Sequence, residues 1–162
     1  MSWPAALNAL LLLIVANLSP WAAARICGPR LGAPLDCGLV LWDGRRLLGD
    51  HKTWRGLVSA CGACSIAAAI VRLPWSLGLE FALLSMAGDG ASSALKRRMG
   101  CEPGREVLAL DQLPEVLLPL IVLRVPLQLG RLETILTAVV FVLLDVMSTR
   151  VRHREFGTPS RK

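Results

Sequence analysis

Long apolar runs separated by shorter polar and basic segments dominate the chain. Runs of this length and composition are typical of helices that cross a bilayer. The pattern predicts an all-α fold, a polytopic membrane helix bundle of about five spans with two cytoplasmic polar loops. One integral membrane domain covers residues 1–162, with spans at 5–24, 56–71, 73–88, 113–129 and 132–149, loops at 25–55 and 89–112, and a tail at 150–162.

The first apolar run permits a second interpretation. Ala22, Ala23 and Ala24 resemble the cleavage site of a signal peptide. No basic residue precedes the apolar core, however, and a signal peptide normally has one. We therefore expect an uncleaved first span.

The positions of the basic residues predict the orientation of the bundle. Of the 18 Lys and Arg residues, 15 lie in segments 25–55, 89–112 and 150–162. Five spans place these three segments on the same side, which the positive-inside rule assigns to the cytoplasm, with the N-terminus outside. A net charge of +6 beside apolar spans fits anionic lipid and phosphate-bearing ligands, and we expect no nucleic-acid partner.

A few residues inside the predicted spans need a separate explanation. Glu80, Arg124 and Asp145 are costly in lipid and should face the bundle interior or a polar cleft. Arg124 can pair with either carboxylate or contact a lipid phosphate.

Small residues on the second predicted span indicate close helix packing. Cys61 and Cys64 form a CxxC motif, but no second Cys/His pair follows, so we expect packing residues rather than a zinc or redox site. The small-residue face leaves open packing within the monomer or across a homodimer, and its members are Gly56, Ala60, Ala63 and Ala67.

Two polar segments interrupt the apolar pattern and carry most of the candidate chemistry. The first reads DGRRLLGDHKTWRG from Asp43 to Gly56, and the second reads GDGASSALKRRMGCEPGREVLALD from Gly88 to Asp111. Carboxylates beside Arg and Lys suit a metal-bound polyphosphate, because carboxylates bind the cation and the basic side chains bind phosphate oxygens. Glycine-rich turns can add backbone amides to such a site. The alternative is a pair of solvated loops whose basic residues anchor the spans.

Taken together, the two segments resemble the CDP-archaeol synthase family of membrane-embedded CTP transferases, which are related to phosphatidate cytidylyltransferases. The family's first loop is similar to DGRR, a hydrophobic stretch, LGD and GKTWRG, and this chain matches it with His51 where glycine is usual. The second loop is similar to GD, S, KRR and LDQL in this order, and this chain has all four between Gly88 and Leu113. The resemblance covers most of the chain.

The resemblance implies a CTP:lipid-phosphate cytidylyltransferase of phospholipid biosynthesis, multi-pass in the cell membrane. Such an enzyme transfers a cytidylyl group from CTP to a lipid phosphate, here digeranylgeranylglyceryl phosphate or a related acceptor, with Mg²⁺ as cofactor and pyrophosphate as the second product. The implied catalytic residues are Asp89, Lys96 and Asp111, of which Asp89 and Asp111 bind the metal. The implied residues that bind CTP or lipid phosphate are Asp43, Gly44, Arg45, Arg46, Lys52, Thr53, Arg97 and Arg98.

Two other functions stay open. One is another lipid-phosphate transferase, such as an enzyme that consumes CDP-lipids, although the paired aspartates of that class are missing. The other is a non-catalytic small membrane protein, a transporter subunit or an assembly factor. It would account for the spans and the basic loops, but not for two polar motifs on one side of the membrane.

Overall fold

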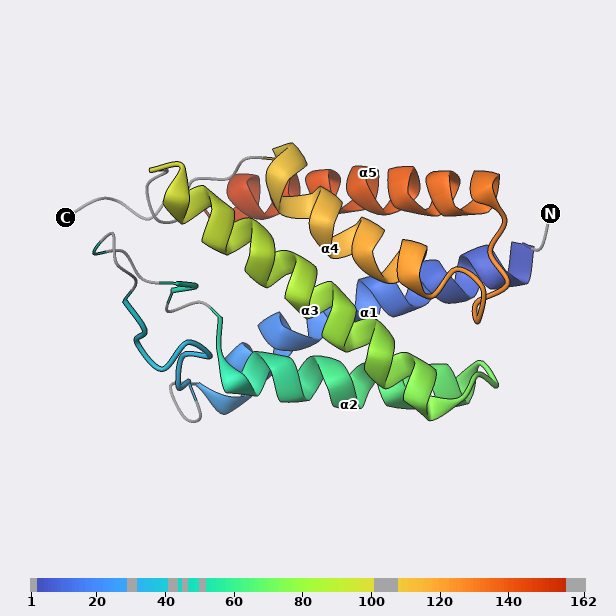
Figure 1. The fold of residues 1–162 in the computed structure, drawn as a ribbon, viewed down its shortest axis with the longest axis horizontal. Helices are drawn as coiled ribbons and strands as arrows, with labels where there is room; N and C mark the ends of the chain where they lie inside the picture. The colour runs from blue at the N-terminus through green and yellow to red at the C-terminus, as the bar shows by residue number, and fades with distance from the viewer. Residues whose placement is uncertain are drawn as a thin grey trace.

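The described residues of the computed structural model form five α-helices and no β-strand (Figure 1). The all-α expectation is confirmed. The structure describes residues 3–28, 32–40, 44, 47–49, 52–100 and 108–156. It does not describe the side chains of residues 108–111 and 149–156. The helices are α1 (Trp3–Cys27), α2 (Trp54–Ile70), α3 (Trp75–Arg98), α4 (Leu108–Val122) and α5 (Arg131–Phe156).

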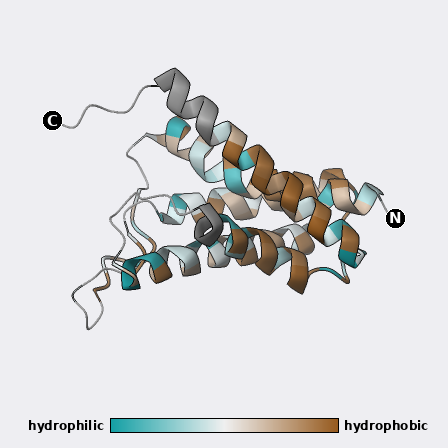
Figure 2. Cartoon of the chain, turned by 90° about the horizontal axis from the view of Figure 1, so that it is seen from above, coloured by the Kyte–Doolittle hydropathy of each residue, from teal (hydrophilic) through white to brown (hydrophobic). Residues whose placement is uncertain are grey.

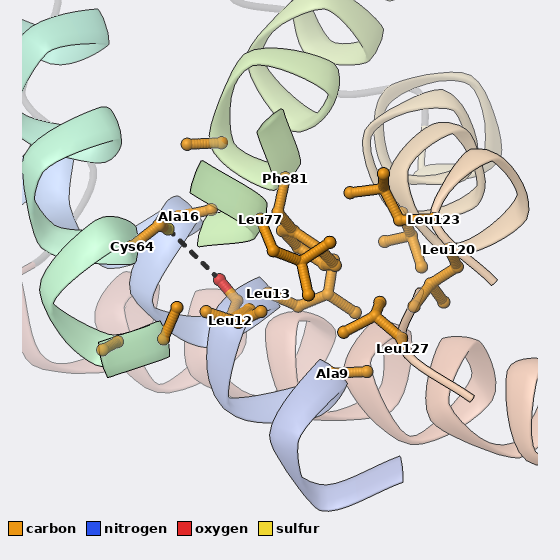
Figure 3. Close-up of a cluster of buried hydrophobic side chains, with 14 of the residues drawn as sticks. Ala9, Leu12, Leu13, Ala16, Cys64, Leu77, Phe81, Leu120, Leu123 and Leu127 are labelled. Carbon is orange, nitrogen blue, oxygen red and sulfur yellow. Dashed lines mark hydrogen bonds between the residues drawn. The ribbon is translucent and has the colours of Figure 1, made fainter. Parts of the chain in front are cut away.

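All five helices contribute buried apolar residues to one core. Helix α3 packs against α2 and α4, and α1 packs against α2, α3 and α5. Leu12, Phe81 and Leu120 are fully buried in the middle of this core (Figure 3). The Sγ atom of Cys64 donates a hydrogen bond to the Leu12 carbonyl oxygen at 3.7 Å, which ties α2 to α1. Helix α1 therefore packs on three other helices, and the uncleaved first span stays a prediction.

Glycines allow α3 to approach both of its neighbours closely. A Cβ atom on Gly78 would lie 2.2 Å from the Cys64 carbonyl oxygen of α2. A Cβ atom on Gly88 would lie 2.2 Å from the Pro114 carbonyl oxygen of α4. Gly56 and Ala60 of the predicted small-residue face are buried within the chain, so the monomer already uses this face and a homodimer stays a prediction.

Both predicted boundaries of the loop at 89–112 are wrong, since α3 ends at Arg98 and α4 begins at Leu108. The loop expected from residue 89 begins only after Arg98, because α3 continues ten residues beyond the predicted end of its span. Glycine and serine near Asp89 resemble turn signals, yet Gly88 packs on α4 and Ser92 is buried with its hydroxyl donating to the Asp89 carbonyl at 2.8 Å. Basic residues in the last turn of α3 also stabilise the helix, because cations interact favourably with the negative end of its dipole.

The fourth predicted span, 113–129, is also helical over a different range. Helix α4 begins at Leu108 and ends at Val122, and residues 123–128 form turns. Pro126 explains the early end, because proline disfavours helical geometry in the residue before it and provides no N–H. Leu123 and Leu127 remain buried, so the apolar run continues into the core as turns.

Hydrophobic residues cover much of the helical surface (Figure 2). Within the described residues, α1 has both the length and the hydropathy to cross a membrane, with a mean hydropathy of 1.7 in its most apolar window. Helix α2 and residues 112–122 are shorter apolar helices.

Neither carboxylate that was expected to pair with Arg124 does so. Glu80 is exposed, and Asp145 accepts a hydrogen bond from Gln112 Nε2 at 2.6 Å.

Candidate active site

A cavity of about 260 Å³ lies between α1, α3, α4 and the start of α2. The first polar loop, which connects α1 to α2, forms its remaining wall. Its wall combines both sequence motifs with residues that neither motif contains. The polar lining residues are Asn17, Lys52, Thr53, Asp89 and Glu115. The remaining lining residues are Pro20, Leu35, Leu48, Gly56, Leu57, Met86 and Gly90.

An ion pair between Lys52 and Asp89 joins the two motifs. Lys52 Nζ bonds Asp89 Oδ2, and the two side chains are 27% and 24% exposed. Lys52 comes from the first polar loop and Asp89 from the middle of α3, so residues 37 positions apart in the sequence meet here. Both were predicted site residues, and the structure brings them together at the cavity. A lysine and a carboxylate at one wall can bind phosphate oxygens and a cation side by side.

Glu115 is a site residue that the sequence analysis missed. Its side chain is 8% exposed, lines the cavity from α4 and accepts a hydrogen bond from Asn17 Nδ2 of α1 at 3.3 Å. Close packing of α3 on α4 places it there, since a Cβ atom on Gly88 would lie 2.8 Å from the Glu115 Cα atom. A glutamate inside an apolar span is the signal that would have found it, because an isolated charge is costly there.

Asp36 organises the first polar loop and was also missed. Its carboxylate is 8% exposed and accepts hydrogen bonds from three backbone amides, those of Gly38 at 3.0 Å, Leu48 at 3.1 Å and Gly49 at 3.2 Å. The Leu35 amide donates to the Lys52 carbonyl at 2.7 Å, which joins the start of the loop to its end. These bonds hold Lys52 at the mouth of the cavity.

Thr53 starts α2 and lines the cavity at the same time. Its Oγ1 atom accepts a hydrogen bond from the Gly56 amide at 3.2 Å, so Thr53 is the N-cap of the helix. An N-cap of this kind satisfies one of the free amides at a helix start. The hydroxyl proton can still donate to a ligand in the cavity. Thr53 lines the cavity beside Lys52, and its role in binding a substrate stays a prediction.

Arg97 contacts the first polar loop. Its Nε atom donates to the Leu48 carbonyl oxygen at 2.5 Å. Gly49 has a φ of +115°, and a Cβ atom there would lie 1.9 Å from the Arg97 guanidinium, so this position requires glycine. The structure therefore gives Arg97 a loop-positioning contact. Lys96 and Arg98 occupy the same last turn of α3 and are not among the cavity-lining residues.

Several predicted site residues lie outside the described part of the chain. These are Asp43, Arg45 and Arg46, while Asp111 falls in α4 with its side chain not described. Gly44 is described and has a φ of +71°, a conformation that glycine adopts readily in turns. Among the described side chains, no three His, Cys, Asp or Glu residues are close enough together to hold a metal ion.

Several known proteins are similar to the chain over most of its length. A family model described as CDP-archaeol synthase (CarS-like) matches residues 5–154. The CDP-archaeol synthase of Aeropyrum pernix is 42% identical over 116 residues, which cover 66% of this chain and 63% of that protein. The CDP-archaeol synthase of Methanopyrus kandleri is 44% identical over 88 residues, which cover 51% of each chain.

The match to a solved structure covers more of both chains. That structure is of an intramembrane enzyme for archaeal membrane lipids biosynthesis, and it aligns with a TM-score of 0.75 at 34% identity. The alignment covers 89% of this chain and 92% of the solved one. Together with the family match over residues 5–154, these similarities show that the chain belongs to the CDP-archaeol synthase (CarS-like) family.

Proposed function

We propose that this protein is a CTP-dependent cytidylyltransferase that makes a CDP-activated lipid for phospholipid biosynthesis. Its acceptor is a membrane lipid phosphate, the archaeal-type digeranylgeranylglyceryl phosphate or a close relative. Family membership supports this proposal. The observation that carries it is the Lys52–Asp89 pair, which places the cationic group of one motif and the carboxylate of the other at one cavity.

The reaction is a phosphoryl-type transfer that needs little proton chemistry. An oxygen of the lipid phosphate forms a bond to the α-phosphorus of CTP, and the bond from that phosphorus to the bridging oxygen of the β-phosphate breaks, releasing pyrophosphate. A phosphate monoester has a second pKa near ~6, so at neutral pH it is already largely a nucleophilic dianion. The chain therefore has to position two anionic substrates and offset their charge.

The oxygen donors at the cavity fit a magnesium ion. Mg²⁺ prefers oxygen ligands and is commonly held by one or two carboxylates together with substrate phosphates. Asp89 and Glu115 offer carboxylates and Asn17 an amide oxygen at the same cavity, and Asp111 remains the second predicted metal ligand. When bound, the metal would neutralise phosphate charge and polarise the reacting phosphorus.

The basic residues would bind the phosphates. Lys52 and Thr53 already face the cavity, so they are the first candidates for oxygens of the triphosphate or of the lipid phosphate. Lys96 and Arg98 would meet the departing pyrophosphate from the end of α3, and Arg97 would fix the first loop while doing so. Arg45 and Arg46 would complete the anion site from the same loop.

The proposed membrane placement follows from the same features. We place α1 to α5 across or within the membrane, with the N-terminus outside and both motifs on the cytoplasmic side. The basic loop residues favour this orientation. It gives the cavity access to cytoplasmic CTP and to lipid from the side of the bundle.

The test is pyrophosphate release by the purified protein with CTP, Mg²⁺ and a panel of lipid phosphates. The panel contains ether-linked isoprenoid and ester-linked diacyl acceptors. We expect turnover with the isoprenoid acceptor, loss of turnover without divalent metal and loss in Asp89→Asn, which keeps the shape of the side chain. Arg72→Gln, in the α2–α3 turn at the other end of the bundle, is the matched control and should stay active. CTP binding without turnover on any acceptor would overturn the assigned acceptor class, and absence of CTP binding would favour the non-enzyme alternative.

A further inference from the structure

A second cavity lies at the opposite end of the bundle from the candidate active site. It has a volume of about 460 Å³ and lies between the end of α4 and the start of α5, near the N-terminal end of α1 (Figure 1). It shares no lining residue with the first cavity. Its lining residues are Leu117, Ile121, Arg124, Val125, Arg131, Thr134 and Ile135.

Two guanidinium groups in this cavity are not neutralised by the described protein. Among the described residues, the side chains of Arg124 and Arg131 have no hydrogen-bond or ion-pair partner. The carboxylate of Glu133, in the first turn of α5, is not among the cavity-lining residues, and its Oε2 atom accepts a hydrogen bond from the Gly130 amide at 2.7 Å. Two positively charged side chains therefore line one cavity that has no carboxylate among its lining residues.

The position of Arg131 increases the need for an anion. Arg131 is the first residue of α5, and the positive end of a helix dipole disfavours a cation there. The hydroxyl of Thr134 does not reduce the charge, since it donates to the Gly130 carbonyl at 2.9 Å. An anionic group at this point would interact favourably with both guanidinium groups and with the helix start.

Most of the remaining side chains that line the cavity are apolar, and this apolar wall reaches the surface of the bundle. Ile121, Val125 and Ile135 are 62%, 79% and 59% exposed, so this wall continues onto the outer surface of the bundle. A free inorganic phosphate would meet only two donors and an apolar wall. A lipid satisfies both parts, because its phosphate can contact the arginines while its chain covers the apolar side chains.

We propose that this cavity binds an anionic phospholipid, separate from the lipid phosphate that the enzyme would convert. The inference rests on the proposed membrane placement but not on the transfer activity. The bound lipid has a phosphodiester headgroup, such as that of phosphatidylglycerol. In the proposed orientation the site lies in the outer leaflet, while the candidate active site faces the cytoplasm.

The test is native mass spectrometry of the whole protein in detergent with equal amounts of phosphatidylglycerol and phosphatidylcholine that carry the same acyl chains. We expect the wild type to prefer phosphatidylglycerol roughly tenfold or more, which is what two arginines near an anionic headgroup provide. The double variant Arg124→Gln/Arg131→Gln should lose this preference. Arg72→Gln removes one arginine at the same end of the bundle and should keep it. If the double variant does not fold, Arg131→Gln alone is used, because this side chain is exposed at the helix start.

Two further measurements distinguish this lipid site from the candidate active site and from a site for free phosphate. Lys52→Gln and added CTP act on the first cavity, so both should leave the phosphatidylglycerol preference unchanged. Added inorganic phosphate should not displace the lipid. Equal binding of the two lipids by the wild type, a preference that survives in the arginine variants, or a preference lost in Lys52→Gln would each overturn the proposal.

Discussion

At the scale of single residues, the Lys52–Asp89 pair explains how the site can be stable before substrate arrives. Each partner neutralises the other in the absence of ligand, so neither charge is left uncompensated at the cavity. A substrate that brings phosphates and a divalent cation would offer each partner a new counter-charge. When the substrate binds, each of the two side chains can therefore exchange one counter-charge for another. Neither charge at the cavity is left uncompensated.

The pair gives a prediction about the charge of Lys52. Lys52→Met keeps the length of the side chain but removes the cation, so CTP turnover should fall by about 10²-fold or more, as for other groups that offset charge in the transition state. Pyrophosphate release measures this. The protein should still fold, because both side chains are about one quarter exposed. Arg72→Gln serves as the charge-loss control, and an equal loss of activity in this variant would contradict the site assignment.

Glu115 permits a sharper test of a buried charge. Glu115→Gln keeps an oxygen that can accept the hydrogen bond from Asn17 but removes the negative charge. We expect normal folding, together with a rise in the Mg²⁺ concentration needed for half-maximal turnover. Asn17→Ala instead leaves the buried carboxylate without its donor and should destabilise the protein by about 1–3 kcal/mol. Thermal unfolding in detergent and a magnesium titration separate the two effects. An unchanged titration in Glu115→Gln would remove Glu115 from the metal site.

At the scale of helices, α3 connects the parts of the site. Asp89 faces the cavity from its middle, and eight residues later Arg97 contacts the first polar loop. Eight residues rise about 12 Å in an α-helix, so one rigid element fixes the distance between the cavity and the loop. The same helix carries Gly88, whose missing side chain lets α4 deliver Glu115.

The sequence predicted the helices well because apolar runs of spanning length have few other stable structures in lipid. It also predicted that Lys52 and Asp89 belong to one site, since the loop charges predict both polar motifs on the same side of the membrane. It did not predict Glu115, Asn17 or Asp36 as site or loop residues. The roles of Glu115 and Asn17 depend on which helix faces cross and how closely, so a polar residue inside an apolar run marks a candidate without showing which site it joins. The role of Asp36 depends on how the loop around it folds.

Helix crossing gives a prediction about stability. In Gly88→Ala, the new Cβ atom would lie 2.2 Å from the Pro114 carbonyl, so α3 and α4 must separate. Overpacking of this kind costs about 1–3 kcal/mol, more than the gain of roughly 1 kcal/mol in helix propensity. We expect a lower melting temperature in detergent and lower activity, because Glu115 moves with α4.

The matched control for this prediction is Gly62→Ala in α2. A Cβ atom on Gly62 would meet nothing within 4 Å. This variant should therefore show only the gain in helix propensity and melt at or above the wild-type temperature. If Gly88→Ala were as stable as Gly62→Ala, close approach of α3 and α4 would not be the reason for glycine at position 88.

At the scale of the whole molecule, the two ends of the bundle differ in chemistry. The first polar loop, the Lys52–Asp89 cavity and the basic end of α3 lie together at one end, and the α2–α3 and α4–α5 turns lie at the other (Figure 1). A membrane enzyme that uses a soluble nucleotide needs its cavity near one surface only. This arrangement is consistent with the proposed orientation, in which the loop end faces the cytoplasm.

The orientation can be tested with two cysteine positions on either side of α2. Cys37 is exposed in the first polar loop and Arg72 lies in the turn after α2. In intact cells, a membrane-impermeant maleimide should not label a variant that retains only Cys37, but should label it after permeabilisation. Arg72→Cys, made without the native cysteines, should react in intact cells. Helix α2 has 17 residues and a length of about 26 Å, so it needs a slightly thinned bilayer to separate the two positions. The reverse labelling pattern would invert the proposed topology, and labelling of both positions from the same side would show that α2 does not cross the membrane.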